Sequence, residues 1–470
     1  MKIEQIYTGC LAQGAYYIVS DGEAAIIDPL REVQPYIDRA AKDGVIIKYI
    51  FETHFHADFV SGHVTLAEKT GAPIIYGPNA NPNFEAIIAE DGQLFQLGKA
   101  TIKVLHTPGH TMESTTYLLQ NEAGEDYAIF TGDTLFLGDV GRPDLAQKAA
   151  ELTQEDLART LYHSLRTKIM PLADEVIVYP AHGAGSACGK NMMKETVDTL
   201  GNQKKMNYAL RADMTEAEFV QEVTDGLEAP PAYFPLNVKL NKEGYQSIDK
   251  VLEKGLRGLS PEAFEVAANE AGALVLDVRH QNDFKAGHVP QSIFIGLNGG
   301  FAPWVGALVK DVYQPLILIT PEGQEEEAVT RLSRVGFDNI LGYLKGGIEA
   351  WKASGKEIDT IDTITAEALA QEYESIKGQL FDVRKPGEYN ASHIEGVHHT
   401  PLSELNQHLA TYPEAGTAFV HCAGGYRSVI AASILKARGI HNIVDIAGGY
   451  NAMKQTDLPQ EDSVCSSSTS

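Results

Sequence analysis

The chain has 470 residues, 44% of them hydrophobic, and this length exceeds what one hydrophobic core usually serves, so we expect two to four domains. The formal net charge of −25 argues against a nucleic-acid partner, because phosphate binding needs clustered Lys and Arg.

No stretch of the chain approaches the roughly 20 apolar residues of a membrane span, and the first residues lack a basic segment followed by an apolar run. We therefore expect a cytoplasmic protein with no membrane partner. Four cysteines, Cys10, Cys188, Cys422 and Cys465, are too few for a disulfide framework in so long a chain. A cysteine with a special role is predicted to be a working thiol.

Residues 1–245 alternate β-rich runs such as AYYIVS and DYAIFTGD with helical patterns such as QPYIDRAAKDG and TQEDLARTLYHSLRTKI. This alternation predicts an α/β sandwich. The stretch APPAYFPLNVKLNKEGYQ has several prolines and little helical periodicity, which predicts a linker or cap that ends this first domain.

Several histidines and aspartates follow the ends of apolar strands in this domain. Three of them alternate in THFHAD after the segment VIIKYIFE, and the others stand in TPGHT, FTGDT and YPAHG. Rigid strands can converge such side chains on one edge of a sheet. The residues therefore predict a metal site, with the candidate ligands His54, His56, Asp58, His110, Asp133 and His182.

The H-x-H-x-D signature and the spaced His, Asp and His resemble a metallo-β-lactamase-fold domain, which implies an N-terminal αββα sandwich. Dinuclear zinc members of that family, such as the glyoxalase II thioesterases, carry H-x-H-x-D-H. Phe59 stands at the last position of the motif here, and its side chain cannot bind a metal. The second metal site is therefore expected to be weakened or absent.

A mononuclear site resembles that of the persulfide dioxygenases, and the resemblance implies that His54, His110 and Asp133 hold one Fe(II) per chain. Two histidines and one carboxylate form the facial arrangement associated with non-haem iron and oxygen chemistry. The segment GDTLFLGDVGRPDL also resembles these enzymes, and Arg142 matches the arginine that lies beside their thiol substrate.

The other candidate ligands, His56, Asp58 and His182, would then orient the iron ligands or contact substrate and oxygen. If they bind metal themselves, the site is dinuclear, Zn(II) replaces Fe(II), and hydrolysis becomes the better interpretation. Cys188 lies close to His182 in the sequence, but a small buried cysteine is the commoner outcome. His63 is expected to start a helix and not to be a ligand.

An internal repeat organises the rest of the chain. The strands LVLDVR and QLFDVR place Asp277 and Arg279 in register with Asp382 and Arg384. We expect two parallel α/β domains, at residues 246–358 and 359–462. The tail, residues 463–470, is expected to be disordered because it ends in SSSTS.

The second copy of the repeat contains a cysteine loop, CAGGYRS, between the strand TAFVH and the helix VIAASILKARG. Cys422 at a helix N-terminus meets backbone N–H groups and the positive end of the helix dipole, which stabilises a thiolate. Arg427 can add a guanidinium that holds an anionic sulfur group. A phosphate-type anion loop with an incidental cysteine is the alternative.

This loop and the DVR, HI-x-G and GG elements around it resemble the rhodaneses. The resemblance implies that Cys422 carries sulfane sulfur as a persulfide, with Gly424 and Gly425 in the substrate-binding loop, whereas Asp382, Arg384 and His393 hold the fold together. In the first copy Pro321 replaces the cysteine and Glu326 the arginine, so that domain resembles an inactive rhodanese. Its retention suggests an interface, and we expect a homo-oligomer.

The whole chain thus resembles a fusion of a persulfide dioxygenase with an inactive and then an active rhodanese domain. Such a fusion implies oxidation of a low-molecular-weight thiol persulfide by O2 to sulfite and thiol, and transfer of sulfane sulfur to sulfite to give thiosulfate, in sulfide detoxification. The thiol can be of the glutathione, coenzyme A, bacillithiol or cysteine type. The alternative is a dinuclear zinc thioester hydrolase of the glyoxalase II type joined to a sulfur-carrier rhodanese.

Overall fold

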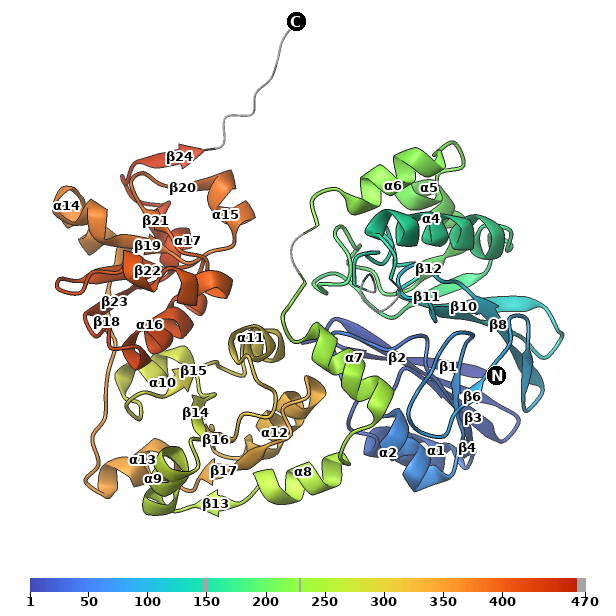
Figure 1. Cartoon of the computed structure of the whole chain (residues 1–470), viewed down its shortest axis with the longest axis horizontal. Helices are drawn as coiled ribbons and strands as arrows, with labels where there is room; N and C mark the ends of the chain where they lie inside the picture. Colours follow the sequence, from blue (N-terminus) through green and yellow to red (C-terminus); the bar gives the residue numbers. More distant parts are fainter. Residues whose placement is uncertain (146, 148–150, 228–229, 463–470) are drawn as a thin grey trace, which may run out of the picture. The chain divides into compact units, whose positions relative to one another are not determined.

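The structure is a computed structural model that describes residues 1–145, 147, 151–227 and 230–462 (Figure 1). The predicted disordered tail and Cys465 lie outside these residues. Two compact units form: Met1–Lys250 with Thr330–Asp338, and Val251–Val329 with Asn339–Ser470. Each unit is described by itself. In the described part of the chain no helix is long and apolar enough to cross a membrane.

The first unit is built on two six-stranded sheets. One sheet follows chain order, with β1 (Lys2–Thr8), β2 (Gln13–Ser20), β3 (Glu23–Ile27), β4 (Ile46–Phe51), β5 (Ile74–Tyr76) and β6 (Ile87–Ile88). The other has the order β12-β11-β10-β9-β8-β7, with β7 (Leu94–Leu97), β8 (Ala100–His106), β9 (Thr115–Gln120), β10 (Asp126–Gly132), β11 (Ile177–Pro180) and β12 (Asp198–Thr199). Pairing is parallel from β3 to β6 and between β10 and β11, and antiparallel elsewhere.

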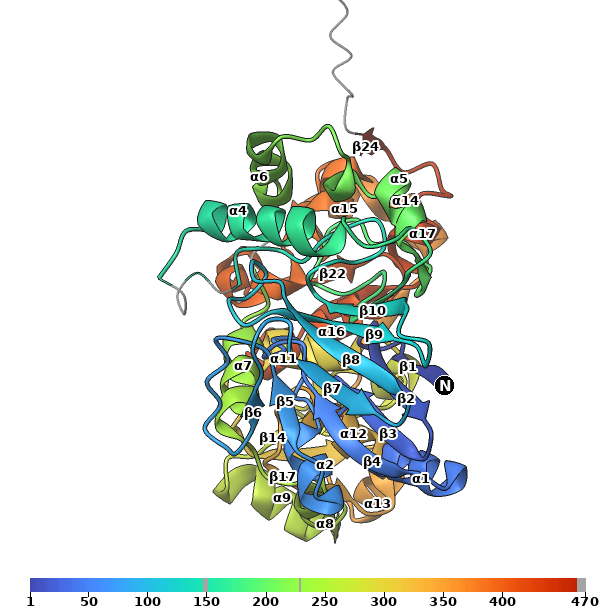
Figure 2. The same ribbon diagram turned by 90° about the vertical axis from the view of Figure 1, so that its right-hand side faces the viewer.

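Helices cover the outer face of each sheet, which gives the expected αββα sandwich (Figure 2). The first sheet packs on α1 (Gln34–Asp43) and α2 (His63–Thr70), and the second on α4 (Gln154–Ser164), α5 (Leu200–Met206) and α6 (Glu216–Thr224). A π-helical turn, Leu165–Ile169, continues α4. Between the sheets, Tyr16, Phe51 and Phe130 belong to a buried core to which both sheets contribute. Burial of these large side chains is the main force that holds the layers together.

The prediction of a linker or cap with little helical periodicity is wrong in its helical part, because α7 (Phe234–Glu243) lies within this stretch, of which residues 230–246 are described. A proline in the first turn of the helix needs no N–H partner there. Asn237 and Asn241, four residues apart on one face, are both buried. Polar residues on the buried face hide the apolar periodicity by which an amphipathic helix is recognised.

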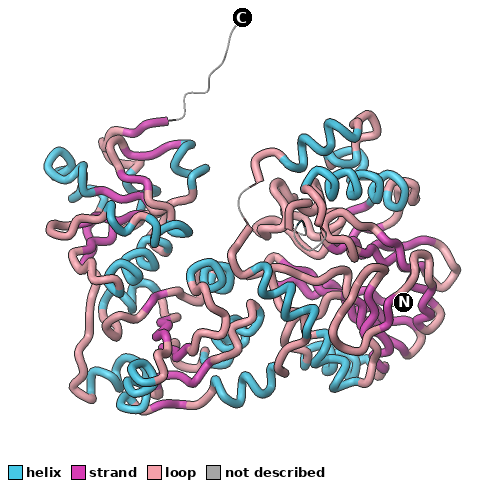
Figure 3. Tube along the Cα trace, in the orientation of Figure 1, coloured by secondary structure: helices cyan, strands magenta, loops and turns pink. Residues whose placement is uncertain are grey.

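The second unit contains two five-stranded parallel sheets with the same strand order. Figure 3 shows their strands in magenta. The first sheet consists of β13 (Gly258–Leu259), β17 (Ile340–Leu344), β16 (Leu316–Ile319), β14 (Leu274–Asp277) and β15 (Ile293–Phe294). The second consists of β18 (Asp362–Ile364), β23 (Ile443–Ile446), β22 (Ala418–His421), β19 (Leu380–Asp382) and β21 (His398–His399). The predicted repeat is therefore a repeat of the whole fold.

Helices connect the parallel strands in both copies, as crossover geometry requires. The chain supplies α8 (Ile248–Gly255), α9 (Pro261–Glu270), α10 (Gln281–Ala286), α11 (Phe301–Leu308), α12 (Glu325–Arg334) and α13 (Gly347–Ala353), then α14 (Ala366–Ile376), α15 (Pro386–Ala391), α16 (Arg427–Ala437) and α17 (Gly449–Met453). A two-stranded ribbon, β20 (Ser392–Ile394) with β24 (Gln460–Asp462), completes the second copy.

The repeated Asp-x-Arg pair has the same structural role in each copy. Arg279 donates to the buried carboxylate of Asp277, with Nη2 2.7 Å from Oδ2, and to the carbonyl of Gly287. Arg384 makes the equivalent bonds to Asp382, at 2.6 Å, and to the carbonyl of Ser392. The pair ties a strand end to the segment after the next helix, so its role is structural, as the sequence predicts for Asp382 and Arg384.

Candidate functional site

The three predicted iron ligands lie together at strand ends in the first unit. His54 follows β4, His110 follows β8 and Asp133 follows β10. All three are buried, and one ligand atom of each lies within 4.8 Å of the others. Asp133 Oδ2 is 3.4 Å from His110 Nε2 and 3.8 Å from His54 Nε2. The sandwich therefore brings two imidazoles and one carboxylate to a single point.

Hydrogen bonds on the far side of each ring aim these imidazoles. His110 Nδ1 is 2.9 Å from the carbonyl oxygen of Arg142, so Nδ1 carries the proton and donates it. Thr53 Oγ1 donates to Asp28 Oδ2 and can therefore accept from His54 Nδ1, 3.0 Å away. Both rings keep Nε2 unprotonated toward Asp133, which is the state that a metal ligand needs. Burial, reinforced by the neighbouring imidazoles, also lowers the pKa of His54 well below its usual value.

The remaining three candidates form an adjoining buried group of His56, Asp58 and His182, again with ligand atoms within 4.8 Å. His182 Nε2 is 3.4 Å from Asp58 Oδ2 and 3.6 Å from Asp133 Oδ1. Asp133 thus directs one carboxylate oxygen to each group. His56 Nε2 lies 3.1 Å from Asp28 Oδ1, a carboxylate that sequence reasoning did not single out.

The residues of this cluster fit a bound cation. Both carboxylate oxygens of Asp133 are buried without a hydrogen-bond partner among the described residues, and so is His182 Nε2. Burial works to lower the pKa of His182, but the carboxylates of Asp58 and Asp133 raise it to about 10. The buried carboxylates therefore favour a positive charge in the cluster, and a divalent ion bound by nitrogen and oxygen ligands would supply it.

Phe59 lies fully buried beside this cluster, with its ring centroid 4.4 Å from that of His56. The second group therefore has an apolar phenyl ring at the position where the H-x-H-x-D-H motif has a metal-binding histidine. The sulfur of Cys188 lies within 4.8 Å of ligand atoms of Asp133 and His182, so the three could share a metal ion. Burial and the carboxylates of Asp133 and Asp58 raise the pKa of the Cys188 thiol well above its usual range, so the thiol is neutral.

Asn241 on α7 holds the loop that carries the H-x-H-x-D motif. Its amide donates to the carbonyl oxygens of His56 and Phe59, each at 2.8 Å, and accepts from the backbone N–H of Ser61 at 2.9 Å. Sequence reasoning missed this residue. The sequence around Asn241 has little helical periodicity, so no local signal indicated that this asparagine is buried or which groups it contacts.

Arg142 is placed by its own neighbours, with only 7% of its surface exposed. Its guanidinium binds both oxygens of Asp144 at 2.7 Å, and its carbonyl oxygen accepts from His110. The predicted substrate arginine therefore also orients a candidate metal ligand through its backbone. His63, as expected, is the first residue of α2 and belongs to none of the metal-ligand groups found in the described residues.

The cysteine loop in the second unit joins β22 to α16. The backbone N–H of Gly425 donates to Cys422 Sγ at 3.1 Å, which is the contact expected to stabilise a thiolate. The carbonyl oxygen of Cys422 accepts from the N–H of Tyr450 at 2.7 Å. Gly449 before it has φ of +53°, and a Cβ there would lie 2.3 Å from the same carbonyl oxygen. The second glycine of the GG element thus lets α17 approach the loop.

Arg427 forms an ion pair that the sequence did not predict. Its guanidinium binds both oxygens of Glu388 on α15, at 2.5 and 2.8 Å, and this hydrogen bonding raises the pKa of Arg427. The equivalent loop of the first copy runs from β16 through Pro321 into α12, whose first turn holds Glu325, Glu326 and Glu327. The loop of the first copy therefore has neither a cysteine thiol nor a positively charged side chain with which to bind an anionic sulfur group.

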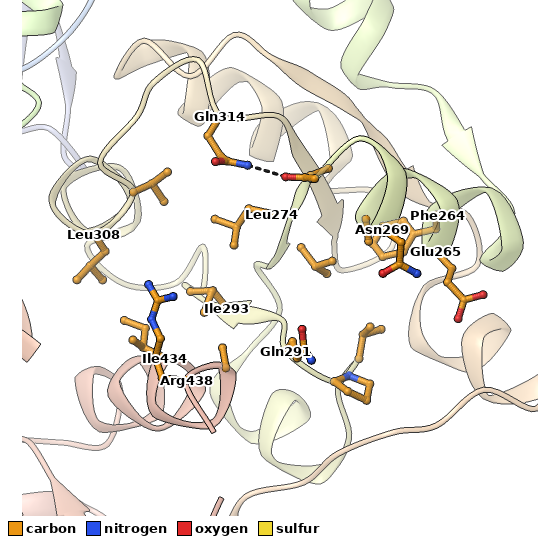
Figure 4. Close-up of a pocket in the computed structure, with 18 of the residues that line it drawn as sticks. Phe264, Glu265, Asn269, Leu274, Gln291, Ile293, Leu308, Gln314, Ile434 and Arg438 are labelled. Atoms are coloured by element: carbon orange, nitrogen blue, oxygen red, sulfur yellow. Dashed lines mark hydrogen bonds between the residues drawn. The ribbon is translucent and has the colours of Figure 1, made fainter. Parts of the chain in front are cut away.

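A separate cavity of about 1090 Å³ lies between the two copies within the second unit (Figure 4). Leu274 and Ile293 line it from the first copy, and Ile434 and Arg438 from the second. Neither Cys422 nor Arg427 lines this cavity, so it is not part of the loop site.

Comparison with known proteins accounts for both halves of the chain. Residues 8–182 match the family model of the metallo-beta-lactamase superfamily, and residues 260–354 and 365–456 match that of the rhodanese-like domain. The hydroxyacylglutathione hydrolase GloC of Haemophilus influenzae is 30% identical over 213 residues, which cover 40% of this chain and 94% of GloC. The mitochondrial persulfide dioxygenase ETHE1 of Homo sapiens is 31% identical over 205 residues, which cover 43% of this chain and 72% of ETHE1.

A crystal structure of a metallo-beta-lactamase from Staphylococcus aureus subsp. aureus COL superposes with a TM-score of 0.64 at 30% identity, and the match covers 73% of this chain and 98% of that one. The chain belongs to the metallo-beta-lactamase superfamily and carries two rhodanese-like domains behind that domain. The predicted fold class and fusion architecture are confirmed. Hydrolase and dioxygenase relatives are similar to the chain to the same degree.

Proposed function

We propose that this protein oxidises low-molecular-weight thiol persulfides with O2 at a mononuclear iron site, and moves sulfane sulfur through Cys422 to sulfite. The observation that carries the proposal is the group of two histidines and one carboxylate, joined in one chain to a cysteine loop suited to a persulfide. The buried phenyl ring of Phe59 beside the second group supports one metal in preference to two.

In this proposal His54, His110 and Asp133 hold the metal. A ferrous ion bound by them would supply the redox chemistry that O2 needs to react with a persulfide sulfur. The protein keeps each imidazole in the required tautomer through Thr53 and the carbonyl of Arg142. Arg142 is proposed to lie beside the thiol part of the substrate.

The second group is proposed to assist without binding metal. His182 lies between two carboxylates, so it can hold a proton and donate a hydrogen bond to an anionic sulfur or oxygen group. Asp28 holds His56 at 3.1 Å and fixes its orientation. The overall oxidation balances as one persulfide, one O2 and one water giving one thiol, one sulfite and two protons.

The sulfur transfer is proposed to occur at Cys422. Its thiolate attacks the outer sulfur of a second persulfide, the S–S bond breaks, and the thiol leaves as a thiolate. The sulfur of sulfite then attacks the outer sulfur of the Cys422 persulfide, which releases thiosulfate and restores the thiolate. The N–H of Gly425 stabilises the anionic sulfur at both stages. Thiosulfate is the net product, and sulfide detoxification is the proposed role.

A second candidate is a dinuclear thioester hydrolase joined to a sulfur carrier. One observation favours it: the ligand atoms of His56, Asp58 and His182, like those of the first group, lie within 4.8 Å of one another, and Asp133 faces both groups. Zinc would be the expected metal for that reaction. The hydrolase relatives agree with it as well as the dioxygenase relatives agree with the first proposal.

The test is O2 consumption by anaerobically iron-loaded protein after addition of glutathione persulfide or coenzyme A persulfide, with metal content measured on the same sample. We expect uptake with about one iron per chain. Two zinc ions per chain, thioester cleavage and no O2 uptake would establish the hydrolase instead.

Two variants separate the two activities. We expect His110→Ala to abolish O2 uptake and to retain sulfur transfer from thiosulfate to cyanide. We expect Cys422→Ser to retain O2 uptake and to release sulfite in place of thiosulfate. His163→Ala is the matched control, because His163 is exposed on α4 and belongs to none of the metal-ligand groups found in the described residues. Thiosulfate formation at the parent rate by Cys422→Ser contradicts the coupling of the two sites.

A further inference from the structure

The first rhodanese-like copy has no cysteine in its own loop, but its residues contact the residues around the cysteine loop of the second copy. Both copies belong to the same compact unit, and α16 packs on β15 of the first copy (Figure 1). Lys285, on α10 of the first copy, places its ammonium Nζ 2.8 Å from Oδ2 of Asp445 on β23. The side chain of Asp445 is 1% exposed and that of Lys285 15% exposed, so a buried carboxylate pairs with a partly buried ammonium.

Asp445 continues the contact to the reactive sulfur. Its Oδ1 accepts a hydrogen bond from Ser428 Oγ at 2.7 Å. Ser428 is fully buried at the start of α16, and its Oγ accepts a hydrogen bond from the thiol Sγ of Cys422 at 3.7 Å. Lys285, Asp445, Ser428 and Cys422 therefore form an unbroken chain of polar contacts from the first copy to the cysteine of the second.

The positive charge of Lys285 affects whether the carboxyl group of Asp445 is ionised. Burial raises the pKa of Asp445, and the hydrogen bond and charge of Lys285 oppose that rise. A buried carboxylate without a cation either takes up a proton or stays charged at high cost. In the first case the neutral carboxyl is a weaker acceptor for the hydroxyl of Ser428, and in the second an uncompensated negative charge lies near the sulfur of Cys422.

A second contact fixes the loop itself. Tyr426 lies between Gly425 and Arg427, and its hydroxyl donates to the carbonyl oxygen of Gly296 in the first copy at 2.7 Å. A Cβ on Gly299 would lie 2.2 Å from the Tyr426 ring, so the first copy fits closely around this side chain. The first copy thus holds the loop at a residue within it and also supports it through Asp445.

We propose that Lys285 is a positioning residue for sulfur transfer at Cys422, so that the copy without a cysteine supplies a group on which the other copy depends. The ammonium keeps Asp445 ionised and bonded to Ser428, which orients the sulfur and balances the charge beneath it. The proposal rests on the proposed sulfur transfer for its biological meaning, but its geometry is independent of the metal site.

The experiment uses the full-length protein and two readouts. The first is the rate of alkylation of Cys422 by iodoacetamide, followed by peptide mass mapping. The second is persulfide formation on Cys422 from thiosulfate, followed by intact mass without added iron or O2. We expect Lys285→Met to slow both by about tenfold, since loss of a buried charged hydrogen bond is worth about that factor. Lys285→Arg restores the cation, and we expect rates within about threefold of the parent.

Lys285→Gln is a second variant that keeps a hydrogen-bond donor without the charge, and we expect it to resemble Lys285→Met. The matched control is Lys436→Met. Lys436 is near the end of α16 and pairs with Asp359 at 3.0 Å, so this change breaks another ion pair of the same unit far along the helix from Cys422. We expect its rates within about twofold of the parent.

A double variant tests the route through Asp445. In the background Asp445→Asn no carboxylate needs a cation, so adding Lys285→Met should change the rates by less than about twofold. Equal rates for Lys285→Met and the parent, or an equal loss in Lys436→Met, overturn the inference. If the parent itself forms no persulfide from thiosulfate, the proposed sulfur transfer fails, and alkylation still decides whether Lys285 positions the thiol.

Discussion

Replacement of Asn241 by leucine should loosen the metal loop and destabilise the first unit. Leucine has the same branching and the same number of side-chain heavy atoms as asparagine but no polar atoms, so the change removes hydrogen bonds without leaving a cavity. Two carbonyl oxygens, of His56 and Phe59, and the N–H of Ser61 lose their partner. Because Asn241 is 1% exposed, water does not readily replace it.

The magnitude follows from these contacts. An unsatisfied buried polar group costs about 1–3 kcal/mol, so three of them cost about 3–6 kcal/mol after some relaxation and the small gain from a more apolar side chain. For a unit of this size, 1 kcal/mol shifts the melting temperature by about 2–4 °C. We therefore expect Asn241→Leu to lower the melting temperature of the first unit by about 10 °C or more. Metal retention should fall with it, because the proposed ligand His54 is two residues before His56 on the same loop.

The assay is calorimetric unfolding with and without added divalent metal, together with metal content after gel filtration. Asn237→Leu is the matched control, since Asn237 is fully buried one turn earlier on α7 and its amide has no hydrogen-bond partner among the described residues. That change should leave the melting temperature unchanged or raise it. Equal destabilisation by the two variants, or normal metal content in Asn241→Leu, refutes the reasoning.

Three further predictions concern single contacts. Gly141→Ala places a Cβ 2.0 Å from the Asp133 carbonyl oxygen and 2.9 Å from His110 Nδ1, so we expect about tenfold weaker metal binding, measured by competition with a chelator. Glu388→Gln frees the guanidinium of Arg427, and the KM for thiosulfate in sulfur transfer to cyanide should fall; an unchanged or higher KM contradicts this. Burial lowers the pKa of His288 to about 4 from the 6.5 expected in the unfolded chain, so the unfolded chain binds the extra proton between these values and stability falls as the pH falls through this window, by about 2 kcal/mol near pH 5. His288→Gln should therefore show a smaller drop in melting temperature between about pH 7 and pH 5 than the parent, and an equal drop would show that His288 does not cause it.

His288 also shows which contacts of the repeat follow from the sequence. His288 and His393 stack on Phe284 and Tyr389, at ring-centroid distances of 3.9 and 3.8 Å, and each bonds the carbonyl oxygen of that aromatic residue. His288 and His393 are at equivalent positions of the two copies, because a duplicated fold keeps residues that serve its own geometry. Their partners are only four residues away, so the contact is local.

Local pattern likewise determined where the candidate ligands would be found. Each is near a strand end, where rigid strands can bring side chains together, so strand alternation and the chemistry of the residues were enough to predict one metal site and one cysteine loop. The helix α7 was not predicted from local pattern, because Asn237 and Asn241 place polar groups on its buried face.

Only the tertiary structure decided which groups support those sites. Asn241 lies far along the chain from the loop it holds, Glu388 from Arg427, and Lys285 from Asp445. Nothing in local periodicity encodes such pairs, because any buried donor can satisfy any acceptor that the fold brings within reach. That Asp133 faces two groups of ligands is also a tertiary result, since it depends on how the ends of two separate sheets meet.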